Sequence, residues 1–147
     1  MDVVFQNTTP DKSFKKDFFE NIIKAGIIGL GLDPKNIEIS INLVEESKIK
    51  ELNKKYRDKD KVTDVLSFPM IEKLSKNLQP SDIGDIFICL PFAKKEAKSE
   101  NIDIDRKLAQ LTVHGFLHLL GHDHEKSEHD AKKMFSLESR ILSKLSF

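Results

Sequence analysis

Residues 114–124 read His-Gly-Phe-Leu-His-Leu-Leu-Gly-His-Asp-His, and this stretch decides how the rest of the chain is organised. Its first two histidines, His114 and His118, are four residues apart, so a helix places both imidazoles on one face, about 6 Å apart along the axis. A histidine eight residues after the first would lie about 12 Å along the same axis, too far to share an ion with it. Gly121 can end the helix instead, because glycine adopts the left-handed conformation, and His124 can then approach from another direction.

Three histidines brought together in this way predict a metal site. Zinc accepts imidazole nitrogens at about 2.0–2.1 Å, and in catalytic sites three protein ligands leave a fourth position open for water. We therefore expect one Zn²⁺ per chain, with His114, His118 and His124 as its ligands. The remaining two of the five histidines, His122 and His129, are expected at the surface or beside the ligands.

Three aspartates are candidates for a general base or for orienting a ligand. Asp123 lies between two histidines after the expected helix end, where a carboxylate can fix the tautomer of a ligand imidazole. Asp64 and Asp85 flank expected strands. For each of the three, the alternative is a purely local role as a turn or cap residue.

Residues 1–147 are expected to form a single domain, because a chain of this length can bury its own core. The 24 basic and 24 acidic residues give a net charge of zero, so the overall charge does not indicate a nucleic-acid partner. A local basic patch would nevertheless be enough to bind one. The single cysteine, Cys89, excludes a disulfide within the chain. Met1–Gln6 lacks the features of a signal peptide, and Ala25–Leu32 is too short to span a bilayer. We expect a cytoplasmic protein with no membrane partner.

Hydrophobic periodicity predicts four strands. The alternation of apolar and polar residues over 36–44 indicates a strand with one exposed face, which we place near a sheet edge. The apolar run at 83–90 is typical of a central strand that is buried on both faces. Two further strands are expected at 3–6 and 62–69, and a polar loop at 70–82.

Helical spacing accounts for most of the remaining chain. The first expected helix begins after a cap at Ser13 and ends at Gly26. Further helices are expected at 45–56, 91–98 and 104–120, and the last helix begins after a cap at Ser127. Strands interspersed with helices indicate an α+β fold. We expect a small mixed four-stranded sheet packed by helices, with the zinc site on a central helix and the turn after it.

The chemistry expected of such a site is hydrolysis, because an open-site zinc lowers the pKa of its bound water to about 7. Zinc peptidases of the metzincin type share this histidine spacing but carry a glutamate as general base directly after the first histidine. Gly115 stands in that place here. This substitution argues against peptide hydrolysis, and a less negative surrounding for the ion favours an anionic substrate such as a phosphodiester.

Three blocks of the sequence resemble the signature blocks of the bacterial YbeY family. They are the histidine stretch, the pair Tyr56-Arg57 followed by Thr63–Pro69, and Gly84-Asp85-Ile86. The histidine block is highly specific, whereas the last block alone is weak. Val62 departs from the family, whose members commonly carry proline before the threonine, and this affects only the stiffness of the chain there.

The resemblance implies a zinc-dependent endoribonuclease that acts on single strands, in maturation of the 3′ end of small-subunit ribosomal RNA and in ribosome quality control. The implied partner is RNA, namely small-subunit ribosomal RNA or the small ribosomal subunit, and no DNA is expected. The resemblance assigns the zinc to His114, His118 and His124 and a functional role to Arg57. A guanidinium suits that role, because its rigid fork of donors matches phosphate oxygens.

Two other classes of function stay open from the sequence. One is a zinc hydrolase acting on peptides or small molecules. The other is a ribosome-assembly factor whose zinc is mainly structural, since metal binding can contribute about 10 kcal/mol to folding. Within the nuclease hypothesis, attack by water and attack by the RNA's own 2′-hydroxyl are equally compatible with the residues.

Overall fold

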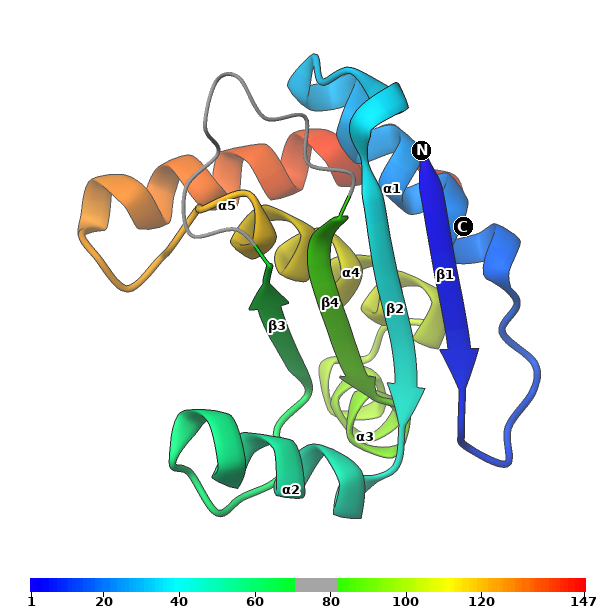
Figure 1. Cartoon of the computed structure of the whole chain (residues 1–147). Helices are drawn as coiled ribbons and strands as arrows, with labels where there is room; N and C mark the ends of the chain where they lie inside the picture. Colours follow the sequence, from blue (N-terminus) through cyan, green and yellow to red (C-terminus); the bar gives the residue numbers. More distant parts are fainter. Residues whose placement is uncertain (71–81) are drawn as a thin grey trace.

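Four strands and five helices make up the part of the chain that the computed structural model describes, residues 1–70 and 82–147 (Figure 1). The strands are β1 (Asp2–Asn7), β2 (Glu38–Val44), β3 (Val65–Pro69) and β4 (Asp82–Cys89). The helices are α1 (Lys16–Leu30), α2 (Glu46–Arg57), α3 (Leu90–Glu100), α4 (Ile104–Leu119) and α5 (Glu128–Leu142), with a short 3₁₀ turn at Pro34–Asn36. The loop expected at 70–82 lies almost wholly outside the described residues.

The strands form one mixed sheet in the order β1-β2-β4-β3. β1, β2 and β4 are parallel, and β3 runs antiparallel to β4 with Val65 opposite Ile88. The predicted α+β class and mixed four-stranded sheet are confirmed, and β4 is interior as expected. Only one face of β4 is fully buried, however, because Asp85 and Phe87 on the other face are partly exposed. The placement of 36–44 near an edge is wrong, because β2 pairs with a strand on each side.

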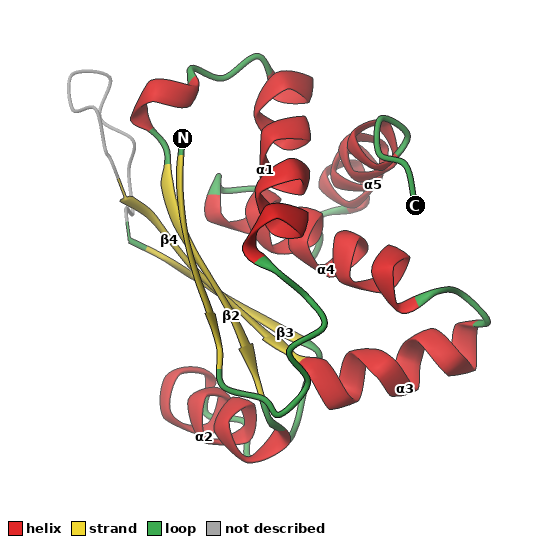
Figure 2. Cartoon of the chain, turned by 90° about the vertical axis from the view of Figure 1, so that its right-hand side faces the viewer, coloured by secondary structure: helices red, strands yellow, loops and turns green. Residues whose placement is uncertain are grey.

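The described helices cover one face of this sheet and leave most of the other face without a helix on it. α1 and α4 pack on the covered face, and α5 packs on both of them from outside (Figure 2). The covered face carries fully buried side chains, among them Ile41, Leu43, Ile86 and Ile88. This layer is the main hydrophobic core, and α4 lies at its centre.

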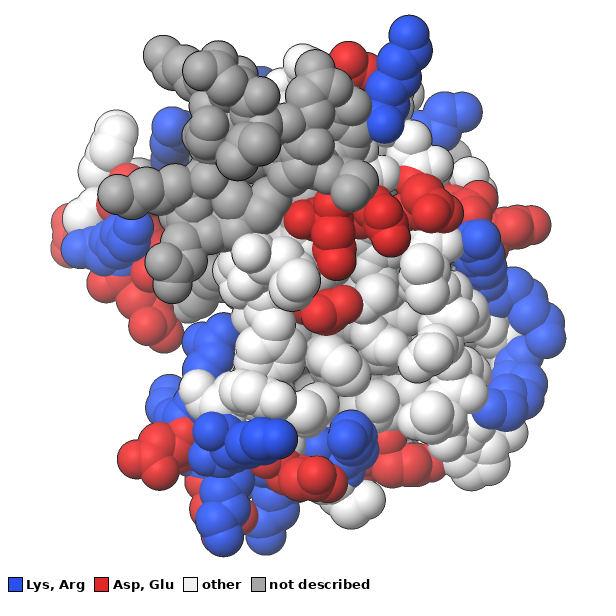
Figure 3. Space-filling model, viewed as in Figure 1, with Lys and Arg blue, Asp and Glu red and all other residues white. Residues whose placement is uncertain are grey.

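The opposite face explains the misleading alternation in β2. Val4, Ser40 and Asp85 share this face, and α2 covers only its lower end, around Val44 and Cys89 (Figures 1 and 3). Acidic side chains gather on the uncovered part (Figure 3). Polar residues therefore alternate along β2 because, among the described helices, only α2 reaches this face and it covers only one end, and not because a neighbouring strand is missing.

α1 differs from its predicted bounds at both ends. Its N-cap is Lys15 rather than Ser13, and it continues through Gly26 to end at Gly31, whose φ of 67° is left-handed. A Cβ on Gly26 would lie 2.8 Å from the ring of Phe116 in α4. This glycine is thus a close contact between two helices and not a helix end.

Candidate metal centre

Helix α4 presents one side to the sheet and an adjoining side to a cavity. Gly115 faces the sheet, where an added Cβ would lie 3.1 Å from the side chain of Ile86 and from Ser67 Oγ. The Ser67 hydroxyl donates a hydrogen bond to the Gly115 carbonyl at 3.3 Å. Close approach of helix and sheet therefore gives a structural reason for glycine in place of the peptidase glutamate. His114 and His118, half-buried, lie on the cavity side.

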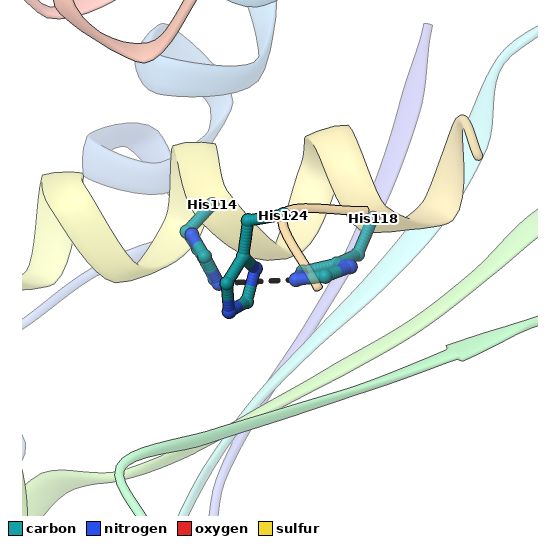
Figure 4. A group of neighbouring side chains, drawn as sticks. All are labelled: His114, His118 and His124. Atoms are coloured by element: carbon teal, nitrogen blue, oxygen red, sulfur yellow. Dashed lines mark hydrogen bonds between the residues drawn. The ribbon is translucent and has the colours of Figure 1, made fainter. Parts of the chain in front are cut away.

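The predicted bend after α4 is present at Gly121. Its φ of 95° is in the region that favours glycine. The Gly121 N–H donates to the His118 carbonyl, and the next N–H, of His122, donates to the Leu117 carbonyl at 3.0 Å. These two bonds close the helix end and turn the chain back, which carries His124 to the open side of His114 and His118 (Figure 4).

The three predicted ligands converge on one point. One ring nitrogen from each of His114, His118 and His124 can be chosen so that all lie within 4.8 Å of one another. The Nε2 atoms of His114 and His118 are 3.1 Å apart (Figure 4). A tetrahedral ion with zinc–nitrogen bonds of 2.0–2.1 Å needs its ligand atoms about 3.3 Å apart. The geometry of these donors therefore fits a single metal ion.

Glu138 of α5 fixes one of these imidazoles. Its Oε1 lies 2.6 Å from Nδ1 of His114, which leaves Nε2 of that ring directed toward the other two histidines. Carboxylates in this position set the tautomer and raise the basicity of a ligand imidazole. Sequence reasoning missed Glu138, because nothing in its neighbourhood marks it and only the packing of α5 on α4 brings it close. Asp123, the candidate for such a role, accepts a hydrogen bond from the Glu125 N–H and shapes the turn.

The surroundings of His118 favour the neutral form of its imidazole. Burial is the main cause that lowers the pKa of His118 below its ordinary value, and the nearby His114 and His124 rings act in the same direction. A neutral imidazole offers the lone pair that a metal ion requires. The electrostatics of the cluster thus agree with its geometry.

Arg57 reaches the same cavity from the end of α2. Its guanidinium donates a hydrogen bond to the Ser67 carbonyl at 2.9 Å and lies over the Phe68 ring, 5.9 Å from the centroid. A cavity of about 380 Å³ is lined by Arg57, Asp64, Asp123 and the three histidines. The structure therefore places the arginine predicted to have a functional role beside the predicted metal ligands, although 57 residues separate it from His114 in the chain.

The remaining aspartate candidates lie in different places. Asp64 lines the cavity and is a neighbour of Glu96 on α3, whose pKa is raised to about 7 by burial and by the Asp64 carboxylate. Asp85 lies on the uncovered face of the sheet, where it accepts a hydrogen bond from the Ser40 hydroxyl. The interior of the sheet separates Asp85 from the histidines, so its side chain does not reach the cavity.

Comparison with known proteins connects this site to a family. A model of the family described as Endoribonuclease YbeY matches residues 4–146. The chain belongs to the YbeY family. Proteins named Endoribonuclease YbeY from Persephonella marina and Aquifex aeolicus are 44% and 40% identical to it over 135 residues, which is 92% of this chain and 86% and 87% of theirs.

A solved structure has a similar fold. The solution structure of a Thermotoga maritima protein has a TM-score of 0.66 and 27% identity to the chain, and the match covers 97% of this chain and 87% of that one. Among the described residues, the helices are all too short or too polar to cross a membrane.

Proposed function

We propose that residues 1–147 act as one hydrolase domain that cuts phosphodiester bonds in single-stranded RNA, with a zinc ion held by His114, His118 and His124. One observation carries the proposal: three convergent imidazoles share a cavity with an arginine, in a chain of a family named for endoribonuclease activity. All three proposed donors are imidazole nitrogens, and borderline-soft zinc suits imidazole ligands.

Each residue of the site then has a distinct role. A bound zinc ion supplies Lewis acidity toward a phosphoryl oxygen and makes water more acidic. Arg57 uses one N–H on the Ser67 carbonyl, which aims the guanidinium, and offers the other donors to a phosphate. Glu138 holds the His114 ring in the tautomer that presents Nε2. Thus α2, α4 and α5 each supply one part of the machinery.

We further propose that the substrate is small-subunit ribosomal RNA near its 3′ end, met in the cytoplasm on or near the small ribosomal subunit, with a role in ribosome quality control. The names of the relatives support RNA as substrate. The net charge of zero supports selection by RNA shape or by a ribosomal partner rather than by broad electrostatic attraction. DNA is not an expected substrate.

The deciding experiment uses protein stripped of metal and then given one equivalent of zinc. We expect cleavage of end-labelled single-stranded RNA, and neither duplex RNA nor DNA of the same sequence should be cut. His118→Ala should abolish cleavage while the circular dichroism spectrum stays that of the parent, and His129→Ala, at an exposed histidine outside the cluster, should leave cleavage unchanged. The chemical groups at the product ends distinguish water attack (5′-phosphate) from 2′-hydroxyl attack (cyclic phosphate).

Two outcomes would replace this proposal by its rivals. Hydrolysis of a peptide substrate, lost in His118→Ala, would favour a zinc hydrolase of another class. Absence of RNA cleavage, together with a His118→Ala variant that unfolds without zinc's support, would favour an assembly factor with a structural zinc.

A further inference from the structure

Phe135 of α5 is exposed in an unusual place. Its side chain is 70% exposed, the largest fraction among the big apolar side chains that the structure describes. Large aromatic side chains are mostly buried, because removing their apolar surface from water is favourable. Phe135 follows Met134, which is 1% exposed, so the helix turns an aromatic ring outward directly beside its buried stripe.

The Phe135 ring adjoins the metal centre through two hollows. A cavity of about 730 Å³ lies between α4, α5 and β3, and its lining includes Arg106, Gln110, His114 and Phe135. A second hollow of about 190 Å³ is lined by His114, His124 and Phe135 among others. His114 also lines the cavity that holds Arg57. All three hollows are lined by His114, and we call the two that Phe135 also lines the α4–α5 groove.

Two neighbouring basic residues beside the α4–α5 groove, Arg106 and Lys107, differ in whether they are paired with carboxylates. Lys107 is buried and paired with Glu100 at 2.7 Å and with Glu96 at 3.7 Å. Arg106 is exposed and takes part in none of the ion pairs found among the described residues. Its guanidinium is therefore available to an anion in the groove.

An exposed aromatic ring and an available arginine beside a nuclease centre match the chemistry of single-stranded RNA. Such strands are held by stacking of bases on aromatic rings and by cations that contact the phosphates. We propose that the α4–α5 groove binds one unpaired nucleotide flanking the cleaved bond, with its base stacked on Phe135 and its phosphate against Arg106. This inference rests on the proposed function, and it explains a preference for single strands, since a base inside a duplex must first be unpaired and unstacked, at a cost in free energy, to reach the ring.

Fluorescence offers a direct test, because the chain contains no tryptophan. Phe135→Trp introduces a single reporter in the groove, and Phe147→Trp introduces one at another exposed phenylalanine outside it. Zinc-loaded protein is titrated in the cold with a short single-stranded RNA, which is shown to be intact afterwards on a gel. We expect quenching of the tryptophan at 135 and no quenching at 147.

Affinity measurements identify the partner of the ring. Phe135→Ala should weaken binding of the RNA by about 5–100-fold, as expected for loss of one stacked base, and Phe135→Tyr should bind as the parent does. We expect the same RNA with an abasic site at one flanking position to bind the parent and Phe135→Ala equally. Circular dichroism shows whether each variant is folded, and the tyrosine variant keeps the test meaningful if the alanine variant is not.

The results separate this inference from the proposed function. RNA cleavage by the parent with no quenching at 135 and unchanged affinity of Phe135→Ala would overturn the nucleotide site alone. Quenching without any cleavage would overturn the proposed function and leave the nucleotide site standing. Self-association of the protein that is lost in Phe135→Ala, with RNA affinity unchanged, would show that the ring serves a second copy of the chain and would overturn the inference.

Discussion

The two sides of α4 differ in what they demand of the sequence. On the packed side, Gly115 and Leu117 lie against the sheet and the neighbouring helices, and a single added carbon at Gly115 would be tight. On the cavity side, His114 and His118 are half-buried and bring imidazole nitrogens to an open centre. The same helical turns thus support the core and carry the chemistry, so a rigid support holds the site in place.

This contrast predicts that substitutions on the two sides of α4 affect different properties of the protein. Substitutions on the packed side should reduce the stability of the fold, and substitutions on the cavity side should reduce metal binding or RNA cleavage in a protein that stays folded. Three substitutions test that separation, and a fourth tests the pH dependence of stability beside the cavity.

The largest expected effect is on the packed side. Gly115→Glu should lower the free energy of unfolding by about 3–5 kcal/mol, because it places an unpaired carboxylate against Ile86 and Ser67. Denaturant titration measures the change. Arg106→Glu, on the exposed surface of the same helix, is the control and should alter stability by less than about 0.5 kcal/mol. Equal stabilities for the parent and Gly115→Glu would remove the proposed reason for the glycine.

The next largest effect is expected from removing the Glu138 carboxylate that orients His114. Glu138→Ala should weaken zinc binding by about 10–100-fold, because the His114 ring loses the carboxylate that orients it. Competition with a chromogenic chelator measures the affinity. Glu128→Ala, at an exposed position of the same helix, should leave it unchanged. An unaltered affinity in Glu138→Ala would mean that the contact contributes nothing to the metal site.

Arg57→Lys should affect RNA cleavage without affecting the metal. The lysine keeps the positive charge but loses the rigid fork and the bond to the Ser67 carbonyl, so we expect about a tenfold slower cleavage with normal zinc affinity. Lys55→Arg, an exchange in the reverse direction on the exposed surface of α2, should change neither property. Parental cleavage by Arg57→Lys would exclude Arg57 from the mechanism.

The smallest effect concerns the pH dependence of stability. Burial and Asp64 raise the pKa of Glu96 from its ordinary 4.5 to about 7, so the folded protein holds a proton that the unfolded chain releases. The raised pKa of Glu96 therefore contributes to the stability of the fold. This contribution is fully present below about pH 4.5 and is lost as the pH rises to about 7. The stability of the parent relative to Glu96→Gln should therefore fall across this window and stay level above it. A constant difference in unfolding free energy from pH 4 to 8 would contradict the shift.

Local signals in the sequence were enough to predict the histidine cluster but not its surroundings. The spacing of His114 and His118 and the bend at Gly121 depend on helix geometry alone, and so does the cap at Ser127, whose hydroxyl accepts the Asp130 N–H at 3.0 Å. In contrast, Glu138 meets His114 only through the packing of two helices.

Long-range packing also accounts for the predictions that were wrong. Gly26 looked like a helix end because its contact with Phe116, 90 residues away, cannot be read from the sequence. The alternation in β2 reported an uncovered face correctly, but the same pattern does not say which strands lie on each side. Periodicity describes the environment of each element, and the order of elements follows from contacts between distant segments.

The central claim is that three histidines hold one ion and leave part of its coordination open. X-ray absorption at the zinc edge, on protein carrying one equivalent of zinc, tests this most directly. The account predicts three imidazole nitrogens at about 2.0–2.1 Å with one additional light ligand in the parent, and two imidazoles in His124→Ala. Two imidazoles in the parent, or a spectrum that His124→Ala leaves unchanged, would contradict it.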